Sequence, residues 1–413
     1  MKTRLLIFSI IIFCFCSRKS THEKDISDSV LRIDLLSEAE AKVTKLSEFA
    51  ENIDYIPLQT TESSLIDRSI LKIVNIDKKT YVKNSGFGGE IMCFDMNGKF
   101  LYKISNTGRG PEEYTFITDF DISSDDKNLI ILSGSNHKLL IYNISDVGFT
   151  FLKSLTLKEP TPSSVSMVPE TDNAFLAIPP WTGTVPTLSL LINTSGDTLH
   201  FKPNCYKYER PPGSQGGFRF KEWLVYSSGN MVCFKEEFSD TVFYVDAKED
   251  SFKPRIVFNT HGTLYTPEMK GGSEKIKNNT TTYIPGIFET SRYVFYWYYT
   301  VIIEQKIVNL YGYLFDRRTE TKYKFDIDKE YRIRLKDDLS GGPDFNIGFQ
   351  DNLCSGGRLF SYIDALTLKK YIAGEDFKNA KVSDPEKKEE LKKLADSLKE
   401  TDNPVLIVVT PKE

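Results

Sequence analysis

A hairpin-like unit recurs along the chain at intervals of about fifty residues. Each copy has an apolar and aromatic run, then an Asp or Asn, a turn and a second β-rich run. The copies are IMCFDMNGKFLYKI (91–104), LLIYNISDVGFTFLKSLTL (139–157), LSLLINTSGDTLHF (188–201), TVFYVDAKEDSFKPRIVF (241–258) and YGYLFDRRTETKYKFDI (311–327). The Asp or Asn falls at residues 95, 143, 193, 246 and 316, so successive copies lie 48, 50, 53 and 70 residues apart.

This repeat predicts a β-propeller. Alternating apolar residues bounded by turn residues are typical of β-hairpins, and a period of about 40–50 residues with about four strands per copy is typical of propeller blades. Large aromatic side chains fill the wedge between neighbouring blades, so most of the 28 Phe and 21 Tyr are interpreted as core. The longest interval contains the polar stretch 261–282, which indicates an inserted loop.

The C-terminal region is expected to form an irregular sixth blade. Residues 346–368 supply strands, a polar helix begins at Asp384 and Pro385 and runs to about residue 400, and residues 402–413 form a buried strand. The apolar stripe that places this helix against the body consists of Leu391, Leu394, Ala395 and Leu398.

The sixth unit is one strand short, and we expect NIDYIPLQT (52–60) to complete it. Such closure removes an exposed sheet edge and locks the ring. The predicted fold class is therefore all-β: a six-bladed β-propeller over residues 45–413, with N-terminal strand closure and one C-terminal helix inserted in the last blade.

The N-terminus indicates export. Two basic residues precede an apolar run that ends near residue 15, a pattern typical of a secretion signal and too short for a stable membrane span. The run ends at Cys16 and resembles a bacterial lipoprotein signal, in which the Cys becomes the lipidated first residue. We therefore predict a signal peptide at residues 1–15, lipidation of Cys16 and a flexible tether over residues 16–44. The alternatives are lipidation at Cys14 and an ordinary cleaved signal peptide.

Composition and motifs exclude several classes of function. The formal net charge is −4, whereas bulk nucleic-acid binding needs a basic face. With only 4 His, a multi-histidine metal site is improbable. The chain has no nucleophile elbow, H-E-x-x-H or P-loop motif. Cys93 and Cys233 sit inside apolar runs and are predicted to be core residues, while a disulfide among the four cysteines after residue 16 stays open.

Several segments together resemble the six-bladed β-propeller lipoproteins of Bacteroidetes. The matching segments are KLSEFAENIDYIPLQTTESSLI (45–66), FDMNGKFLYKISNTGRGPEEY (94–114), GGPDF (341–345) and LADSLKETDNPVLIVV (394–409). The most specific motif, which is also similar to NHL-type propellers, comprises Gly108, Gly110, Pro111, Glu113 and Tyr114. The resemblance implies a six-bladed ring and an extracytoplasmic location, and it carries no catalytic residue to any position of this chain.

The first candidate site is the loop NTGRGPEEY (106–114), which is expected to link the outer strand of one blade to the inner strand of the next. Such connections run toward one face of a propeller near its central opening, so Arg109, Glu112 and Tyr114 are candidate ligand-binding residues. The structural alternative is that Arg109 or Glu113 ties adjacent blades together.

Two further loops carry candidate residues. LSGGPDFN (339–346) presents Asp344, with Asp337 and Asp338 just before it, and carboxylates in this arrangement could bind calcium. The alternative is a turn stabilised by Asp side chains. IPPWTGTVPT (178–187) presents Trp181, which suits glycan or peptide stacking; the alternative is that it packs on its own loop.

Trp223 and Trp297 differ from Trp181 because they lie in strand-like runs. They are therefore expected to be core residues.

The leading functional hypothesis is a non-enzymatic, lipid-anchored propeller of the cell envelope, periplasmic or at the outer membrane surface. It would bind a glycan, a peptide or an envelope protein on one face of the ring, with no nucleic-acid partner and with membrane contact only through the lipid. No cofactor is expected, calcium being the one exception considered. The alternatives are a metal-assisted hydrolase or lyase with its site at the central opening, and a purely structural assembly component.

Overall fold

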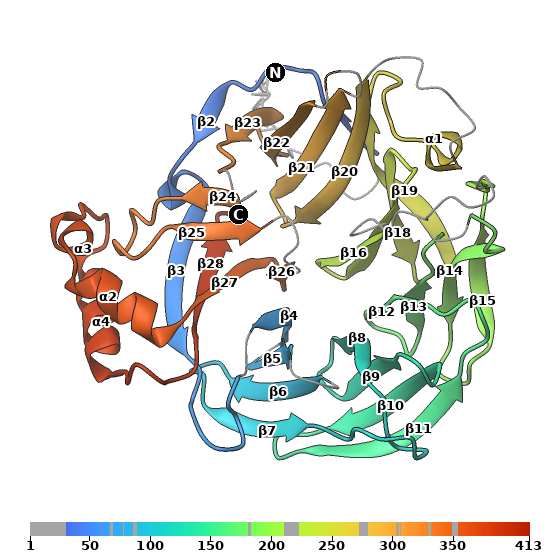
Figure 1. Ribbon diagram of the computed structural model, residues 1–413, viewed down its shortest axis with the longest axis horizontal. Helices are drawn as coiled ribbons and strands as arrows, with labels where there is room; N and C mark the ends of the chain where they lie inside the picture. The colour runs from blue at the N-terminus through green and yellow to red at the C-terminus, as the bar shows by residue number, and fades with distance from the viewer. Residues whose placement is uncertain are drawn as a thin grey trace, which may run out of the picture.

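The computed structural model shows sheets arranged as blades around a ring (Figure 1). It describes residues 30–66, 69–76, 78–85, 89–180, 183–209, 223–271, 280–302, 305, 307–328, 332–348 and 354–413. Six sheets of four or five strands form the blades, and each blade has its first strand at the centre of the ring. The predicted six-bladed β-propeller is confirmed.

The blades follow one another in chain order. Blade 1 comprises β4 (Ile70–Ile76), β5 (Lys79–Asn84), β6 (Glu90–Asp95) and β7 (Phe100–Ile104), and blade 2 comprises β8 (Ile117–Ile122), β9 (Asn128–Ser133), β10 (Lys138–Ile144) and β11 (Phe149–Thr156). Blade 3 comprises β12 (Ser164–Met167), β13 (Ala174–Ala177), β14 (Thr187–Ile192) and β15 (Thr198–Pro203), and blade 4 comprises β16 (Trp223–Ser228), β17 (Met231–Glu236), β18 (Thr241–Asp246) and β19 (Ser251–Asn259). Blade 5 comprises β20 (Thr280–Glu289), β21 (Tyr293–Ile302), β22 (Ile307–Asp316) and β23 (Thr321–Phe325).

The repeated sequence unit is the outer hairpin of each of these five blades, formed by its third and fourth strands. In blades 1, 3, 4 and 5 the Asp or Asn at the end of the third strand closes the turn with its side chain, whereas Asn143 of blade 2 donates to the Lys127 carbonyl oxygen. In blade 1, Asp95 Oδ1 accepts hydrogen bonds from the backbone N–H groups two and four residues later, at 2.8 and 2.9 Å. Asn193 Oδ1 makes the same two contacts in blade 3, each at 2.9 Å. A local turn requirement therefore explains why these residues recur.

Blade 6 is built from both ends of the chain. Its strands are β26 (Cys354–Ser355), β27 (Arg358–Ile363), β28 (Val405–Pro411) and, outermost, β3 (Ala50–Pro57). β3 pairs antiparallel with β28, with Tyr55 opposite Ile407. The predicted closure by residues 52–60 is confirmed, and it joins the two ends of the chain in one sheet.

The segment before β3 also belongs to the propeller. β1 (Leu31–Asp34) adds a fifth strand in parallel to β19, and β2 (Ala41–Val43) does the same on β23. The prediction of a flexible tether to residue 44 is therefore wrong for these strands, because the outer edges of blades 4 and 5 bind them. Residues 1–29, with the predicted signal peptide and Cys16, lie outside the described residues.

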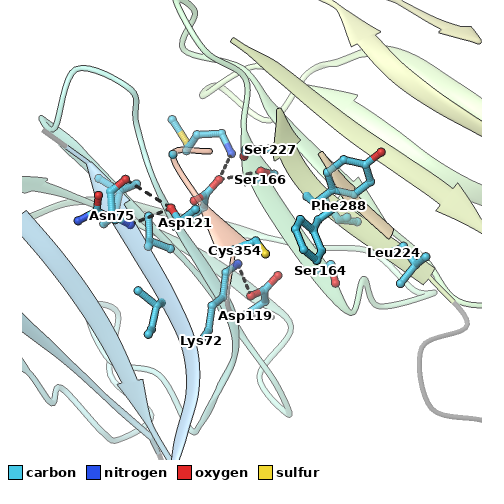
Figure 2. A pocket seen from close by; sticks show the side chains of 18 of the residues that line it. Lys72, Asn75, Asp119, Asp121, Ser164, Ser166, Leu224, Ser227, Phe288 and Cys354 are labelled. Carbon is cyan, nitrogen blue, oxygen red and sulfur yellow. Dashed lines mark hydrogen bonds and ion pairs between the residues drawn. The ribbon is translucent and has the colours of Figure 1, made fainter. Parts of the chain in front are cut away.

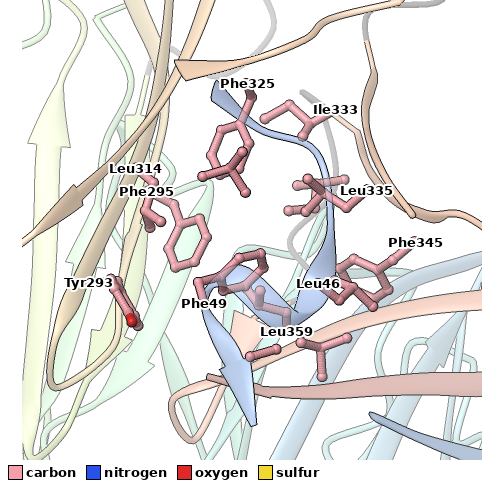
Figure 3. Packing of buried hydrophobic residues seen from close by; sticks show 14 of the residues in the cluster. Leu46, Phe49, Tyr293, Phe295, Leu314, Phe325, Ile333, Leu335, Phe345 and Leu359 are labelled. Carbon is pink, nitrogen blue, oxygen red and sulfur yellow. The ribbon is translucent and has the colours of Figure 1, made fainter. Parts of the chain in front are cut away.

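Aromatic packing fills the wedges between blades, as expected. At the junction of blades 5 and 6, Phe295 stacks on Phe288 with ring centroids 4.4 Å apart, and Phe49 meets Phe295 edge-on at 5.4 Å (Figure 3). Phe49 follows the short 3-10 helix η1 (Leu46–Glu48), so the N-terminal segment contributes directly to this core. Cys93 and Cys233 are fully buried, which confirms them as core residues.

Three helices lie between β27 and β28, namely α2 (Ala365–Ala373), α3 (Glu375–Asn379) and α4 (Pro385–Ser397). α4 is the predicted helix, and Asp384 caps it by accepting the backbone N–H groups of Glu386 and Lys387, each at 3.1 Å. Leu391 and Ala395 on its stripe are buried against α2 and β28. None of the helices in the described parts of the chain is long and apolar enough to cross a membrane.

The structure corrects the end of the region 346–368 that was predicted to supply strands, because α2 begins at Ala365. A two-stranded sheet of β24 (Arg332–Leu335) and β25 (Phe345–Gly348), which was not expected, packs beside blade 6. The insertion predicted at 261–282 contains the short helix α1 (Pro267–Gly271), and part of it lies outside the described residues.

Candidate functional site

A cavity of about 200 Å³ lies at the centre of the ring. The inner strands of all six blades, β4, β8, β12, β16, β20 and β26, contribute to its lining (Figure 2). Inner strands from blades far apart in sequence therefore meet at one place. The cavity has two unlike walls, one polar and one apolar.

The polar wall is centred on an ion pair between blades 1 and 2. Lys72 Nζ on β4 lies 2.8 Å from Asp119 Oδ1 on β8 and donates to the carbonyl oxygen of Phe120 at 2.6 Å. Burial alone would lower the pKa of Lys72, but the carboxylates of Asp119 and Asp121 outweigh burial and raise it. Lys72 is therefore a fixed cation of the cavity wall at neutral pH.

The two carboxylates also tie blade 2 to blade 3. Asp119 Oδ2 accepts the backbone N–H of Val165 at 3.0 Å, and Asp121 Oδ2 accepts the hydroxyl of Ser166 at 2.7 Å and the N–H of Met167 at 2.8 Å. These donors belong to β12, the inner edge strand of its sheet, which has no neighbouring strand on that side. The two carboxylates therefore accept hydrogen bonds that a neighbouring strand would otherwise accept. Burial raises the pKa of Asp121, opposed by Lys72 and by the hydrogen bonds from Ser166 and Met167.

A further hydrogen bond joins blade 6 to blade 1 at the same wall. The backbone N–H of Asn75 donates to Ser355 Oγ at 2.8 Å, and this hydroxyl lies 3.4 Å from the Asn75 carbonyl oxygen. The polar wall is thus continuous from blade 6 through blades 1 and 2 to blade 3.

The opposite wall is apolar and comes from blades 4 and 5. Leu224 on β16 and Phe288 on β20 line the cavity across from the charged side chains (Figure 2). Trp223 and Trp297 are buried in strands, which confirms them as core residues, and parts of both reach the cavity lining. The Trp297 ring covers Gly286 so closely that a Cβ at this glycine would overlap it.

Tyr226, which lines this wall, belongs to a buried charged cluster. The hydroxyl of Tyr226 donates to Glu289 Oε1 at 2.7 Å, and Arg255 Nε lies 3.0 Å from each oxygen of the same carboxylate. Arg317 also pairs with Glu289, whose side chain is fully buried. Burial alone would lower the pKa of Arg255, but Glu289 raises it, whereas burial together with Arg255 lowers the pKa of Arg317.

The loop predicted to approach the central opening lies elsewhere. It does connect the outer strand β7 to the inner strand β8, as expected. However, side chains of β10, the third strand of blade 2, hold it: Lys138 donates to the Gly110 carbonyl at 2.7 Å and Tyr142 to the Glu112 carbonyl at 2.8 Å. Arg109 and Glu112 are exposed and do not line the cavity.

Tyr114 and Glu113 have structural positions in this loop. Tyr114 is fully buried between blades 1 and 2, and its hydroxyl lies 3.2 Å from the carbonyl oxygens of Gly89 and Ile104. A ligand contact at Tyr114 is therefore not compatible with this position. Glu113 Oε2 accepts the backbone N–H of Gly110 at 2.7 Å, so its carboxylate organises the loop itself.

The second predicted loop is a turn built around Asp337. This buried carboxylate accepts hydrogen bonds from the backbone N–H groups of Leu339, Ser340 and Gly342 at 2.8 to 3.0 Å and from the Tyr55 hydroxyl at 2.9 Å. The Asp-stabilised turn considered for this loop is confirmed.

Asp344 in the same loop is exposed and outside the cavity. Among the residues that the structure describes, no three His, Cys, Asp or Glu side chains gather as metal ligands. Trp181, the remaining candidate, lies outside the described residues.

The residues that form the polar wall were not among those predicted. The sequence ITDFDI of β8 places Asp119 and Asp121 two positions apart, which puts both on one face of a strand. Charged residues on a face of an otherwise apolar inner strand are a signal for the centre of a propeller. Using this signal requires knowing that β8 is an inner strand.

The fold and cavity define the protein as a six-bladed β-propeller with a mixed polar and apolar central cavity. The chain belongs to the family described as Domain of unknown function (DUF4934), which matches residues 30–410. It is similar in structure to a presumed exported protein of Bacteroides fragilis, at 19% identity and a TM-score of 0.61, covering 93% of this chain and 100% of the other. A DUF4221 family member of Bacteroides vulgatus matches at 13% identity and a TM-score of 0.42, covering 70% and 92%. No curated protein sequence matches.

Proposed function

We propose that this protein is an extracytoplasmic binding module that takes a small ligand group into its central cavity. The observation that carries the proposal is the cavity itself, with a charged and hydroxyl-bearing wall facing an apolar wall. Binding sites combine apolar surface with a few fixed polar groups in this way. The ligand would be part of a glycan, a peptide or an envelope protein, with no role for nucleic acid.

The proposed location rests on the N-terminal sequence. A signal peptide at residues 1–15 and a lipid on Cys16 would hold the propeller on the periplasmic or outer surface of the envelope. The similarity to a presumed exported protein supports the same location. Mass spectrometry of the protein purified from membranes tests it, because a lipid on Cys16 would add its mass to the N-terminal peptide.

The wall chemistry favours binding over turnover. Asp119 and Asp121 already accept hydrogen bonds from blade 3, and Lys72 is engaged by Asp119. These groups form a preorganised surface and need not rearrange to meet a ligand. The metal-assisted hydrolase or lyase remains a separate hypothesis, which elemental analysis for calcium and zinc in the purified protein tests.

A blocked cavity tests the proposal. Ser227 is exposed on the cavity lining, and Ser227→Trp would fill the space with an indole; Ser195→Trp, in the exposed outer turn of blade 3, is the matched control. Thermal unfolding is measured with a panel of saccharides and short peptides, because a ligand at 100 times its Kd adds about 2.7 kcal/mol of stability. We expect a ligand that raises the Tm of the wild type and Ser195→Trp but not of Ser227→Trp. An equal rise in all three would place the site elsewhere.

A further inference from the structure

We propose that the group bound in the central cavity is an uncharged sugar ring. This inference rests on the proposed function of the cavity and names the chemistry of its ligand. Three properties of the lining carry it: the state of the charged side chains, the neutral polar groups beside them, and the apolar wall opposite.

The charged side chains of the lining are already paired with one another or with the backbone. They are one cation, Lys72, and two carboxylates, Asp119 and Asp121. The cation contacts Asp119 and a carbonyl oxygen, and the carboxylates accept the N–H groups of Val165 and Met167. An anionic ligand would face an excess of negative charge, and a cationic ligand would compete with Lys72 for the same carboxylates. Both kinds of charged ligand are therefore disfavoured.

Neutral hydroxyls supply the remaining polar chemistry. Ser164 on β12 of blade 3 and Ser227 on β16 of blade 4 both line the cavity (Figure 2). A serine hydroxyl both donates and accepts, as a sugar hydroxyl does, so the two can exchange hydrogen bonds in either direction. Lys72 adds a charge-assisted donor within the same wall.

The apolar wall suits the C–H face of a sugar ring. Only 5% of Phe288 is exposed and this part lines the cavity; stacking of its ring on Phe295, at a centroid distance of 4.4 Å and 13° between planes, fixes its orientation. Leu224 extends the apolar surface beside it (Figure 2). A ring with an apolar face and a hydroxyl-rich edge therefore matches both walls at once, whereas a purely apolar or purely polar group matches one.

The size of the cavity limits how much of a glycan it can hold. Its volume of about 200 Å³ is below the ~300–1,000 Å³ of pockets that enclose drug-sized ligands. The cavity therefore accommodates one sugar ring, either free or as the terminal residue of a glycan, with the rest of the chain outside.

The experiment compares sugars that differ mainly in charge. Methyl glycosides of glucose, galactose and mannose are matched with their uronates and with the corresponding 2-amino sugars, and binding is measured by saturation-transfer NMR and calorimetry. We expect at least one neutral glycoside to bind, and its charged counterparts to bind at least tenfold more weakly. A uronate or amino sugar that binds as tightly as its neutral partner, or the absence of binding by every neutral glycoside, would overturn the proposal.

Two variants locate the binding. Phe288→Leu should weaken binding of the neutral glycoside at least tenfold, whereas Phe201→Leu, at an exposed phenylalanine on the outer strand of blade 3, should leave it unchanged. Ser227→Trp supplies an independent block if Phe288→Leu fails to fold. Unchanged affinity in Ser227→Trp would place the sugar outside the cavity and overturn the proposal. If a peptide binds wild type but not Ser227→Trp while no sugar binds, the sugar assignment fails and the binding function stands.

Discussion

Lys72 on the inner strand of blade 1 and Asp119 on the inner strand of blade 2 form an ion pair at 2.8 Å in the wall of the central cavity. Their side chains are 20% and 15% exposed, so water screens the pair only in part. Replacing the carboxylate leaves the ammonium group half-enclosed and without its counter-charge. The pair therefore stabilises the ring and also fixes the charge of the site.

Asp119→Asn should lower the free energy of unfolding by about 2 kcal/mol, because Lys72 loses its partner and Val165 N–H keeps only a weaker acceptor. Urea denaturation measures the change. Asp396→Asn is the matched control, since Asp396 pairs with Lys392 on an exposed helix surface and such pairs contribute less than about 1 kcal/mol. Equal small effects for the two variants would contradict a stabilising role for the cavity pair.

The contribution of Asp121 to the free energy of unfolding should decrease as the pH rises through the pKa of its carboxyl group. Burial raises its pKa in the folded state above 3.8, so the protonated form is favoured by folding at low pH and this contribution is lost as the pH rises through the folded pKa. The free energy of unfolding of the wild type should therefore fall relative to that of Asp121→Asn between acidic and neutral pH. If the wild type instead gains stability relative to the variant over that range, the hydrogen bonds from Ser166 and Met167 outweigh burial in setting the pKa of Asp121.

The closure strand β3 should be essential for cooperative folding. Deleting residues 50–60 removes the outer strand of blade 6 and separates the two ends of the ring. Deleting residues 30–35 removes only β1, a fifth strand on blade 4, and is the control. We expect the first deletion to abolish the cooperative thermal transition by circular dichroism and the second to lower its midpoint. A normal transition after deletion of residues 50–60 would contradict the closure.

Gly286 should tolerate no side chain while Trp297 is present. A Cβ at Gly286 would overlap the indole, so Gly286→Ala should cost about 1–3 kcal/mol through displacement of Trp297. The same substitution in a Trp297→Ala background should cost less, because the indole atoms that the Cβ meets are then absent. A double-mutant cycle by urea denaturation checks this, and additive costs would rule out the steric explanation.

The sequence predicts those parts of the fold that depend on local rules. The outer hairpins are visible because residues such as Asp95 and Asn193 close their turns with their side chains. Strands β1 and β2 are not visible, because they are only four and three residues long and form by pairing with the edges of β19 and β23. Helix α2 was missed because β-branched and aromatic residues precede it, although Asp364 caps it by accepting the N–H of Thr367.

The site forms only when the ring of blades closes, and a local sequence pattern does not show which residues the closed ring brings together. Lys72 and Asp119 are 47 residues apart and meet only when blades 1 and 2 pack side by side. The Gly-rich loops are conspicuous in the sequence because their backbones need special conformations, but Tyr114 and Asp337 show that these loops serve packing and turn formation. A conspicuous loop motif thus indicates a structural requirement as readily as a binding site.

The most direct test of this account is a crystal structure of the protein with the tightest-binding neutral glycoside of the panel. We predict electron density for the sugar ring in the central cavity, with its hydroxyl edge toward Lys72 and Ser164 and its C–H face on Phe288. Density for the ligand at the Arg109–Glu112 loop or on the outer edge of a blade, with the central cavity empty, would contradict it.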